Sequence, residues 1–504
     1  MNESYDSPLV TVRELSEHVG RRVTLRGWLY NRRSKKTIHF LEVRDGTGIV
    51  QAIASQEDVD EDTFALAGRL AQEAAIRVTG TVQADERAQG GVELVVHALE
   101  LIAAPHAEYP IPISRDVPNV DFLIQRRHLW LRSKKPWATL RIRHETIQAI
   151  RDFFYQRDFV CFDAPIFTPN ACEGTTTLFP VPYFELGEAY LTQSGQLYEE
   201  AGALAFGKVY NFGPVFRAEK SKTRKHLTEF WMIEPEMAFA ELDDVMELAE
   251  QFVAYVVGRV LERCQTELKM LGRDTAELEG CTKLPYPRIS YAEACRLIAE
   301  TAPRLKDESE TELRDKALKA MRFDEREVRK RMKGEAPKKV EAELAAQRND
   351  IFDNLIAGAM KPEGESAHSL GDDFGAPDET ILSLHYDQPV LVHRWPEPIK
   401  AFYMKADAQN PGYVLGVDMI APNGYGEIIG GGQREDDLTR LEEQVRKHEL
   451  PQEEFEWYLD LRRFGSVPHG GFGLGLERTV AWLCGSRHIR ETIPFARTID
   501  RHTP

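Results

Sequence analysis

The sequence has little cysteine, and its cysteines are not arranged for cross-linking or metal binding. Six of the 504 residues are cysteines, and they are scattered along the chain: Cys161, Cys172, Cys264, Cys281, Cys295 and Cys484. No two of them form a Cys-x-x-Cys pair, which argues against a disulfide framework or a structural zinc site. Unpaired cysteines are typical of a reducing compartment, so we expect a cytoplasmic protein.

Long apolar runs and a net positive charge are also missing. No uninterrupted apolar stretch has the length needed to cross a bilayer. The first residues lack a basic region followed by an apolar one, so we expect no secretory signal. The formal net charge of −17 excludes attraction of nucleic acid by the whole surface, but a local basic patch still acts over about one Debye length. With 42% hydrophobic and 29% charged residues, the chain has the composition of a globular protein with two or three domains.

Residues 1–104 have the pattern of a small β-barrel domain. Five segments predict strands: Val23–Leu29, Ile38–Val43, Gly48–Ile53, Ile76–Val82 and Val92–His97. Apolar residues at helical spacing predict a helix over Leu66–Ala75, between the third and fourth strands. Five strands with a helix in this position are typical of a Greek-key barrel of the OB type.

This domain also carries local positive charge. Eight Lys and Arg residues lie between positions 21 and 44, opposed there by only Glu42 and Asp45: Arg21, Arg22, Arg26, Arg32, Arg33, Lys35, Lys36 and Arg44. Phe40 lies on a predicted strand within this stretch, and barrels of this type hold unstacked bases on such aromatic, basic faces. The alternative is that Phe40 belongs to the core and the cations form a solvated face. The composition favours nucleic-acid binding.

Residues 105–135 predict a linker or hinge, since prolines punctuate a polar run, and residues 136–504 predict a second, larger domain. Within it we predict helices over 138–157 and 242–271 and a strand over 158–162. Two further strands, over 209–217 and 230–236, are joined by a polar loop dense in cations.

Strands that follow one another through short loops favour an α+β fold, with an antiparallel sheet flanked by helices, over a parallel Rossmann-type sheet. Residues near 300–350 are mostly charged and have helical spacing. They predict an exposed helical insertion, to which no chemistry is assigned.

The stretch from Gly471 to Arg478 has glycine at alternate positions, which lets a flat group lie against its backbone. Alone, this pattern fits a strand packed on a helix equally well. Together with Arg217 and the cationic loop, it forms a constellation suited to nucleotidyl transfer. Two arginines neutralise an α-phosphate while a substrate carboxylate attacks it, and nearby carboxylates hold magnesium.

Three stretches together resemble the motifs of class II aminoacyl-tRNA synthetases, in the subgroup with an N-terminal OB-type anticodon-binding domain. Asp158–Phe162, followed by Pro165, resembles the first motif, which builds a dimer interface in this family. The segment that begins at Phe216-Arg217-Ala-Glu219 resembles the second motif, and Gly471–Arg478 resembles the third. The resemblance implies a homodimeric ligase that uses ATP and Mg²⁺ and acts on tRNA.

The resemblance also assigns roles residue by residue. Arg217 and Arg478 are the implied catalytic arginines, Arg217 at the α-phosphate and Arg478 on the adenine and the γ-phosphate. Further residues implied to bind ATP are Glu219, Arg224, His226, Phe230 and Glu427, with the Phe230 ring stacked on adenine. Asp418 and Glu427 are the implied magnesium ligands. Glu173 and Glu234 are implied to hold the substrate ammonium group, and Arg33, Phe40 and Gln51 are implied to read the anticodon.

The subgroup contains enzymes for lysine, aspartate and asparagine, so the amino acid has to be inferred separately. The resemblance places Arg434 at the substrate side chain, which fits an acid or its amide. Aspartate enzymes typically have Gln-Leu-(Phe/Tyr)-Lys, whereas this chain has Gln196-Leu-Tyr followed by Glu199 and Glu200. Carboxylates there repel aspartate and accept hydrogen bonds from the amide of asparagine. The chain is therefore most similar to the asparaginyl enzymes, and we expect an asparagine–tRNA ligase.

Three alternatives stay open at this point. An aspartyl enzyme with relaxed tRNA specificity is disfavoured by Glu199 and Glu200. A non-catalytic, synthetase-like RNA-binding paralogue has no physical reason to retain the arginines and carboxylates named above. A free asparagine synthetase built on the same core has no use for an N-terminal barrel of the anticodon-binding type.

Overall fold

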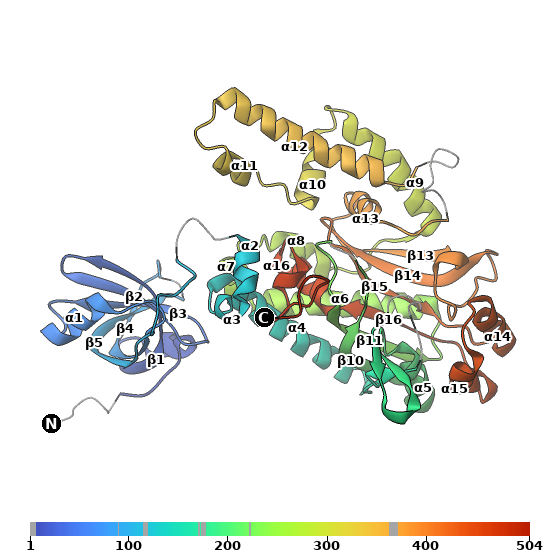
Figure 1. Ribbon diagram of the computed structural model, residues 1–504, viewed down its shortest axis with the longest axis horizontal. Helices are drawn as coiled ribbons and strands as arrows, with labels where there is room; N and C mark the ends of the chain where they lie inside the picture. The colour runs from blue at the N-terminus through green and yellow to red at the C-terminus, as the bar shows by residue number, and fades with distance from the viewer. Residues whose placement is uncertain are drawn as a thin grey trace. The chain divides into compact units, whose positions relative to one another are not determined.

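The computed structural model describes residues 7–88, 90–113, 119–169, 172, 178–220, 223–361 and 371–503. The chain divides into two compact units, Met1–Trp130 and Leu131–Pro504 (Figure 1). Each unit has its own hydrophobic core. Among the described residues, no helix combines the length and the apolar character that a membrane span requires.

The first unit contains a closed barrel with the strand order β1-β2-β3-β5-β4. Its strands are β1 (Arg22–Lys35), β2 (Ile38–Arg44), β3 (Ile49–Ser55), β4 (Ala75–Ala84) and β5 (Val92–Ala103). Alternate side chains, such as Leu41 and Val43 on β2, are completely buried in the barrel interior. The barrel confirms the OB-type domain predicted from the alternating segments.

The helix of this unit begins earlier than the apolar spacing predicts. It is α1 (Glu61–Arg69), because the Asp60 side chain accepts a hydrogen bond from the Thr63 backbone N–H and caps the helix start. The chain leaves the helical conformation at Leu70, so the predicted second half of the helix is a connection into β4. Two short helices, α2 (Val120–Gln125) and α3 (Arg127–Trp130), lie in the segment predicted as a linker.

The second unit is built on a sheet with the order β12-β13-β14-β15-β16-β11-β10-β6. Its strands are β6 (Val160–Cys161), β10 (Lys208–Phe216), β11 (Glu229–Ala238), β12 (Arg288–Ser290), β13 (Val390–Pro396), β14 (Tyr413–Ala421), β15 (Gly426–Gln433) and β16 (His469–Gly475). Only the outermost pairs, β10 with β6 and β12 with β13, are parallel in the described sheet. This arrangement confirms the antiparallel α+β fold.

Neighbouring glycines leave no space for side chains between the central strands β15, β16 and β11. A Cβ atom on Gly431 would lie 2.4 Å from the Gly471 carbonyl oxygen, and one on Gly471 would lie 2.0 Å from the Pro235 carbonyl oxygen. Any other residue at these positions would collide with backbone. The middle of the sheet is therefore a bare floor of main-chain atoms, which we call the glycine floor.

Helices cover one face of this sheet, mainly α4 (Lys134–Tyr155), α6 (Leu242–Arg263) and α16 (Leu476–Cys484), which share its core (Figure 1). The single helix predicted over 242–271 breaks at Cys264 and continues as α7 (Gln265–Leu271). Helix α5 (Gln196–Phe206) was not predicted, and the strand predicted over 158–162 is reduced to the two residues of β6.

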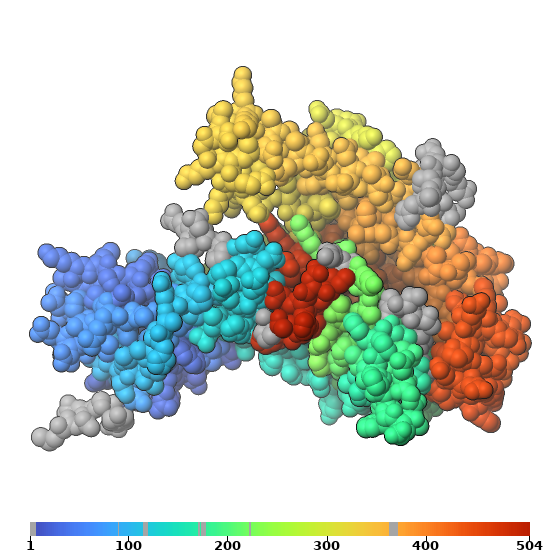
Figure 2. All heavy atoms as spheres, viewed as in Figure 1, coloured from blue at the N-terminus to red at the C-terminus, as the bar shows by residue number. Residues whose placement is uncertain are grey.

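The charged segment forms three helices, α10 (Thr311–Ala320), α11 (Glu325–Arg331) and α12 (Pro337–Gly358), which we call the insertion helices (Figures 1 and 2). They pack with α9 (Tyr291–Thr301) and α13 (Ala376–Ser383) around a separate apolar cluster. The remaining α-helices and strands in the described part of the unit are α8 (Ala276–Glu279), α14 (Leu438–Lys447), α15 (Gln452–Arg463) and a small sheet of β7 (Phe167–Thr168), β8 (Pro180–Pro182) and β9 (Glu188–Leu191).

Candidate active site

Two adjoining cavities lie over the glycine floor of the second unit. The first cavity has a volume of about 130 Å³ and the second about 290 Å³. They share four lining residues: Arg217, Met232, Glu427 and Gly473. A molecule in one cavity can therefore react with a molecule in the other across these residues.

The first cavity has arginines on two sides of the glycine floor. Arg217 follows β10, and its guanidinium carbon lies 5.5 Å from the ring centre of Phe230 on β11. Arg478 comes from the first turn of α16 and donates to the Glu427 carbonyl oxygen at 3.0 Å. A planar group that enters here meets an aromatic ring, two guanidinium groups and bare backbone, which together suit a nucleotide base and its phosphates.

Most residues assigned to ATP line this first cavity: Arg217, Glu219, His226, Phe230, Glu427 and Arg478. His226 Nε2 lies 3.7 Å from a carboxylate oxygen of Glu219. Burial and the nearby Arg478 lower the pKa of His226, which favours a neutral imidazole. Arg224 is placed differently, because it lines a larger neighbouring cavity.

At the boundary of the two cavities, carboxylates converge above Gly430. A Cβ atom on Gly430 would lie 2.8 Å from Glu427 Oε1 and 3.4 Å from Asp418 Oδ1. The other oxygen of Asp418 accepts a hydrogen bond from Lys400 Nζ at 2.6 Å. Burial raises the pKa of Asp418 to about 7, with Glu427 adding to the shift and Lys400 opposing it. A cation near these oxygens would favour the ionised form.

Three of the residues assigned to the amino acid line the second cavity: Gln196, Glu234 and Arg434. Glu234 accepts hydrogen bonds from the Gly195 backbone N–H at 3.0 Å and from Asn211 Nδ2 at 3.1 Å, and also from Ser194 Oγ. These bonds fix its carboxylate at the cavity wall.

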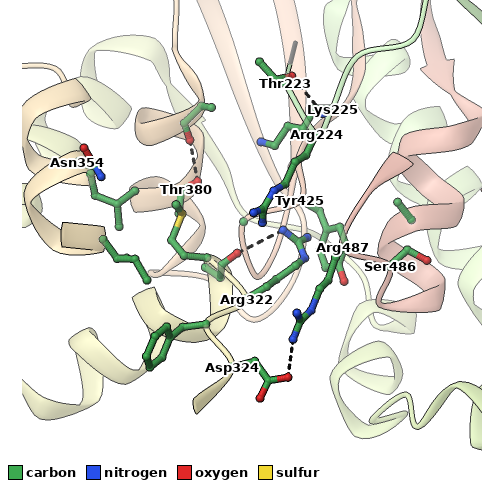
Figure 3. Close-up of a pocket in the computed structure, with 18 of the residues that line it drawn as sticks. Thr223, Arg224, Lys225, Arg322, Asp324, Asn354, Thr380, Tyr425, Ser486 and Arg487 are labelled. Carbon is green, nitrogen blue, oxygen red and sulfur yellow. Dashed lines mark hydrogen bonds and ion pairs between the residues drawn. The ribbon is translucent and has the colours of Figure 1, made fainter. Parts of the chain in front are cut away.

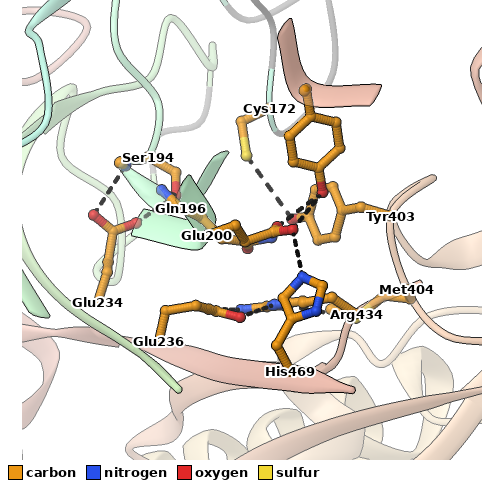
Figure 4. Close-up of polar contacts among 12 residues, drawn as sticks. Cys172, Ser194, Gln196, Glu200, Glu234, Glu236, Tyr403, Met404, Arg434 and His469 are labelled. Carbon is orange, nitrogen blue, oxygen red and sulfur yellow. Dashed lines mark hydrogen bonds and ion pairs between the residues drawn. The ribbon is translucent and has the colours of Figure 1, made fainter. Parts of the chain in front are cut away.

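The far end of the second cavity is closed by an ion pair between Arg434, which directly follows β15, and Glu236 on β11. Arg434 donates from Nε and Nη2 to the two oxygens of Glu236, at 3.0 and 2.9 Å, and each side chain is only 1% exposed (Figure 4). The third nitrogen, Nη1, lies 3.8 Å from Met404 Sδ. Burial raises the pKa of Glu236, and the Arg434 guanidinium opposes this shift. The cavity thus ends in a carboxylate and a guanidinium that balance each other.

Glu200 lies behind this pair, within a network of its own. Its carboxylate accepts a hydrogen bond from Gln196 Nε2 at 3.1 Å and lies 2.9 Å from His469 Nε2 (Figure 4). It also accepts hydrogen bonds from Arg462 Nη2 at 2.6 Å and from Tyr458 Oη at 2.8 Å. Burial alone would raise the pKa of Glu200, but Arg462 and His469 outweigh it and hold the pKa well below its usual range.

The neighbouring residue on α5, Glu199, is not part of this network. It is fully buried, and burial together with Glu234 and Glu236 raises its pKa to about 10, so it is protonated at neutral pH. Neither Glu199 nor Glu200 lines the second cavity. This differs from the prediction that both carboxylates contact the substrate side chain, because α5 turns both of them into the protein interior.

The barrel of the first unit has a groove of about 670 Å³ on one side, and Arg33, Phe40 and Gln51 all line it. Arg33 Nη2 donates to Gln51 Oε1 at 3.2 Å, and the Arg33 and Lys35 cationic groups lie 5.9 and 5.8 Å from the Phe40 ring centre. Phe40 therefore faces the groove rather than the barrel core, and its ring is available to stack on a base.

Comparison with known protein families agrees with both units. Residues 119–499 match the family of tRNA synthetases class II (D, K and N), and residues 23–102 match the OB-fold nucleic acid binding domain. The chain is a class II tRNA synthetase. Its relatives within this family include asparagine–tRNA ligases from several bacteria.

Two of these relatives come from Sorangium cellulosum and Thermus thermophilus. The first is 49% identical over 500 residues, which cover 99% of this chain and 100% of the relative. The second is 48% identical over 495 residues, which cover 98% and 100%. This synthetase also resembles the crystal structure of asparaginyl-tRNA synthetase from Pyrococcus horikoshii complexed with asparaginyl-adenylate, with a TM-score of 0.80, 39% identity and coverage of 98% and 99%.

Sequence reasoning assigned no role to several functional candidates of the synthetase. Glu236 and Lys400 line the second cavity, and Arg462 and His469 hold Glu200 behind it. The alternation along β11 places Glu236 on the same side as Glu234, which is the one signal for it in the sequence. Glu173, which was predicted to bind the amino acid, lies outside the described residues. Pro165 is exposed beyond β6.

Proposed function

We propose that this synthetase joins asparagine to tRNA in two steps. An oxygen of the asparagine carboxylate attacks the α-phosphorus of ATP, the bond to the bridging oxygen breaks, and pyrophosphate leaves. A hydroxyl of the terminal tRNA ribose then attacks the carbonyl carbon of asparaginyl-adenylate, and AMP leaves with the bonding electrons.

The position of Arg217 carries the first step of this proposal. It lines both cavities, so one guanidinium group faces the nucleotide side and the amino-acid side together. At that boundary it can bind the α-phosphate and the attacking carboxylate at once, which orients the two reactants and stabilises the charge of the transition state. Phe230 and Arg478 would hold the adenine between them.

The donor set at the cavity boundary fits a magnesium ion. Glu427 Oε1 and Asp418 Oδ1 converge over Gly430, and hard carboxylate oxygens are the ligands that Mg²⁺ prefers. When bound, the ion would neutralise phosphate charge and orient the phosphates. Lys400 holds the second oxygen of Asp418 and keeps its carboxylate aimed at the same point.

The closed end of the second cavity favours a neutral side chain. Arg434 is neutralised by Glu236, and Arg462 by Glu200, so a substrate carboxylate would add an unbalanced charge in a buried site. Arg434 Nη1 can donate to the amide oxygen of asparagine. The Glu236 carboxylate, which also lines the cavity, can accept from the amide nitrogen.

The groove of the first unit supplies the tRNA contact of this proposal. Phe40 would stack on an anticodon base, while Arg33 and Gln51 would bind base edges. All three residues line one groove, which supports this assignment.

We also propose that the synthetase is a homodimer. Large apolar side chains are exposed around β6 and the β8–β9 hairpin, including Phe184 (90% exposed) and Leu186 (82% exposed). Phe167 on β7 is also exposed, and its ring centre lies 5.8 Å from the ring centre of Tyr183 in the β8–β9 hairpin. Exposed apolar surface of this kind marks protein interfaces, and a second copy of the chain would cover it. In the described part of the chain the six cysteines form no disulfide bonds with one another, which supports a cytoplasmic location.

Pyrophosphate exchange tests the catalytic part of the proposal. The purified enzyme should exchange labelled pyrophosphate into ATP when asparagine is present and should do so far less with aspartate or lysine. Arg478→Ala should abolish exchange while tRNA binding remains nearly intact. Exchange with aspartate of equal or greater efficiency would refute the proposed specificity.

A further inference from the structure

Two carboxylates at the boundary of the first and second cavities each use their oxygens in two directions. Asp418 lies on β14 and Glu427 on β15, and one oxygen of each lies near the position that a Cβ atom on Gly430 would take, at 3.4 and 2.8 Å. The other oxygen of Asp418 accepts a hydrogen bond from Lys400 Nζ at 2.6 Å. The other oxygen of Glu427 lies 3.6 Å from Arg478 Nη1. Each candidate metal ligand is therefore already paired with a cation of the protein.

The surroundings of Lys400 keep its ammonium group beside Asp418. Lys400 lies in the segment between β13 and β14, and its side chain is 17% exposed. Its Nζ lies 4.0 Å from the ring centre of Trp395, which is itself buried. Because a partly buried charge is screened much less than one at the surface, Lys400 acts strongly on any other cation that Asp418 binds.

The other carboxylates that line the second cavity have different surroundings. Glu236 is paired with Arg434, Glu234 accepts the hydrogen bonds described above, and Asp373 is exposed. Within the described ranges, no group of three or more His, Cys, Asp or Glu side chains is arranged to hold a metal ion. The described part of the site therefore offers a metal ion two carboxylates, and its remaining ligands have to come from water or substrate.

The cations of the loop between β10 and β11 lie elsewhere. Arg224 lines a third cavity, of about 1000 Å³, and the described lining of that cavity includes neither Asp418 nor Glu427 (Figure 3). Lys225 Nζ lies 2.8 Å from a carboxylate oxygen of Glu379. Of the cations named so far, Lys400 therefore makes the closest contact with a candidate metal ligand.

The charge balance at this boundary depends on whether ATP is present. Without nucleotide, the two carboxylates and their two cations cancel, and a divalent ion would bring uncompensated positive charge into a partly buried site. ATP brings several negative charges and phosphate oxygens, which are ligands that Mg²⁺ prefers. The nucleotide thus supplies both the charge and the ligands that the protein alone does not.

We propose that Lys400 sets the metal affinity of this site, so that the free enzyme binds Mg²⁺ weakly and retains it together with ATP. This inference rests on the proposed function. Lys400 is a positioning residue: its ammonium group holds one oxygen of Asp418 and repels a second cation from the other. The ion therefore binds tightly only when phosphates outweigh this repulsion.

The competing role for Lys400 is direct contact with substrate, because it also lines the second cavity. An ammonium group there would bind the carboxylate of asparagine or a phosphate of ATP. Loss of that contact would weaken substrate binding and leave metal binding by the nucleotide-free enzyme unchanged. The two roles therefore predict different results in a metal titration that contains no substrate.

The test titrates Mn²⁺ into the full-length enzyme without nucleotide and follows the electron paramagnetic resonance signal of the free ion. Mn²⁺ is a suitable probe because it takes the same oxygen ligands as Mg²⁺. Lys400→Met removes the charge and keeps an unbranched side chain, whereas Lys400→Arg keeps the charge. Lys405→Met is the matched control, since it removes another partly buried lysine that pairs with carboxylates, those of Glu435 and Asp436.

Without nucleotide we expect the unaltered enzyme, Lys400→Arg and Lys405→Met to bind Mn²⁺ weakly. Lys400→Met should bind it about 100-fold more tightly, because it loses the repulsion of a neighbouring unit charge. Lys400→Met/Asp418→Asn should lose this tight binding, which would assign it to the site above Gly430. In the unaltered enzyme, an ATP analogue with a methylene group between the α- and β-phosphorus atoms should bring about tight binding, after subtraction of the analogue titrated alone.

Three results would overturn the inference. The first is Mn²⁺ binding by nucleotide-free Lys400→Met that stays as weak as in the unaltered enzyme; a thermal melt shows whether the variant is folded, and Lys400→Gln replaces it if it is not. The second is tight binding by the unaltered enzyme without nucleotide. The third is equal tightening in Lys405→Met, which would indicate a general charge effect. Failure of the proposed function looks different, because the unaltered enzyme would then show no pyrophosphate exchange with asparagine.

Discussion

The buried pair of Arg434 and Glu236 gives a quantitative prediction about substrate choice. In the unaltered enzyme the two charges cancel, so an aspartate side chain at the end of the second cavity gains little attraction to compensate for its lost hydration. Glu236→Gln keeps the shape of the side chain and removes its charge, which leaves Arg434 with a net positive charge. The variant should therefore accept aspartate better relative to asparagine.

The size of this effect follows from Coulomb's law. Two unit charges about 4 Å apart attract by about 4 kcal/mol at an effective dielectric constant of about 20. Allowing for relaxation around Arg434, we expect about 3 kcal/mol in favour of aspartate, which changes the ratio of the two kcat/KM values about 100-fold. The ratio is the useful quantity, because a general loss of activity affects both substrates.

Pyrophosphate exchange with each amino acid, measured on the same preparation, gives this ratio. Glu250→Gln is a matched control, since it breaks another carboxylate–guanidinium pair, with Arg288 Nε at 2.6 Å, away from the cavities described above. The control should leave the ratio unchanged. If Glu236→Gln remains folded in a thermal melt and its ratio stays within twofold of the original, the charge-balance argument is wrong.

Three further predictions concern other parts of the molecule. Because the pKa of Glu199 is raised from 4.5 to about 10, the folded chain keeps a proton that the unfolded chain releases, and stability falls by about 1.4 kcal/mol per pH unit across that window. Glu199→Gln should remove this fall, so denaturant unfolding at pH 6 and pH 9 should differ less than in the unaltered protein; an identical difference would contradict the assignment. Phe184→Asp/Leu186→Asp should produce monomers in sedimentation experiments, and a persistent dimer would exclude this surface as the interface. Phe40→Ala should weaken tRNA binding by about 1–3 kcal/mol, which raises the KM for tRNA, and should leave pyrophosphate exchange unaffected. Unchanged charging would show that the ring does not stack on a base.

Barrel strands such as β2 and β3 could be predicted because their side chains alternate between fully buried and partly buried positions. Helix α5 could not, since Gln196, Glu199 and Glu200 are buried polar residues that interrupt the apolar spacing on which helix prediction depends. The start of α1 was missed for another reason. Its boundary is set by the Asp60 cap rather than by the apolar residues that follow.

The composition of the candidate site was predictable from motifs, but its internal pairing was not. Arg434 and Glu236 are 198 positions apart, and nothing local in the sequence indicates that they bind each other. The orientation of Glu200 likewise depends on Arg462 and His469, which are brought to it by α15 and β16. Long-range contacts of this kind are decided by the packing of the whole sheet. The sequence identifies the residues, and the fold decides which of them face the substrate.

The glycine floor has a consequence for inhibitors. A compound that lies flat on β15 and β16 touches main-chain atoms, and Gly431 and Gly471 leave no space for a side chain between the strands. A resistance mutation at either position would have to push neighbouring backbone apart and would damage the sheet before it displaced the compound. Resistance would then have to arise at the rim, through residues such as Met232 and Met404 whose flexible side chains can be replaced. Compounds that make most of their contacts with the floor should therefore retain their affinity longest under selection.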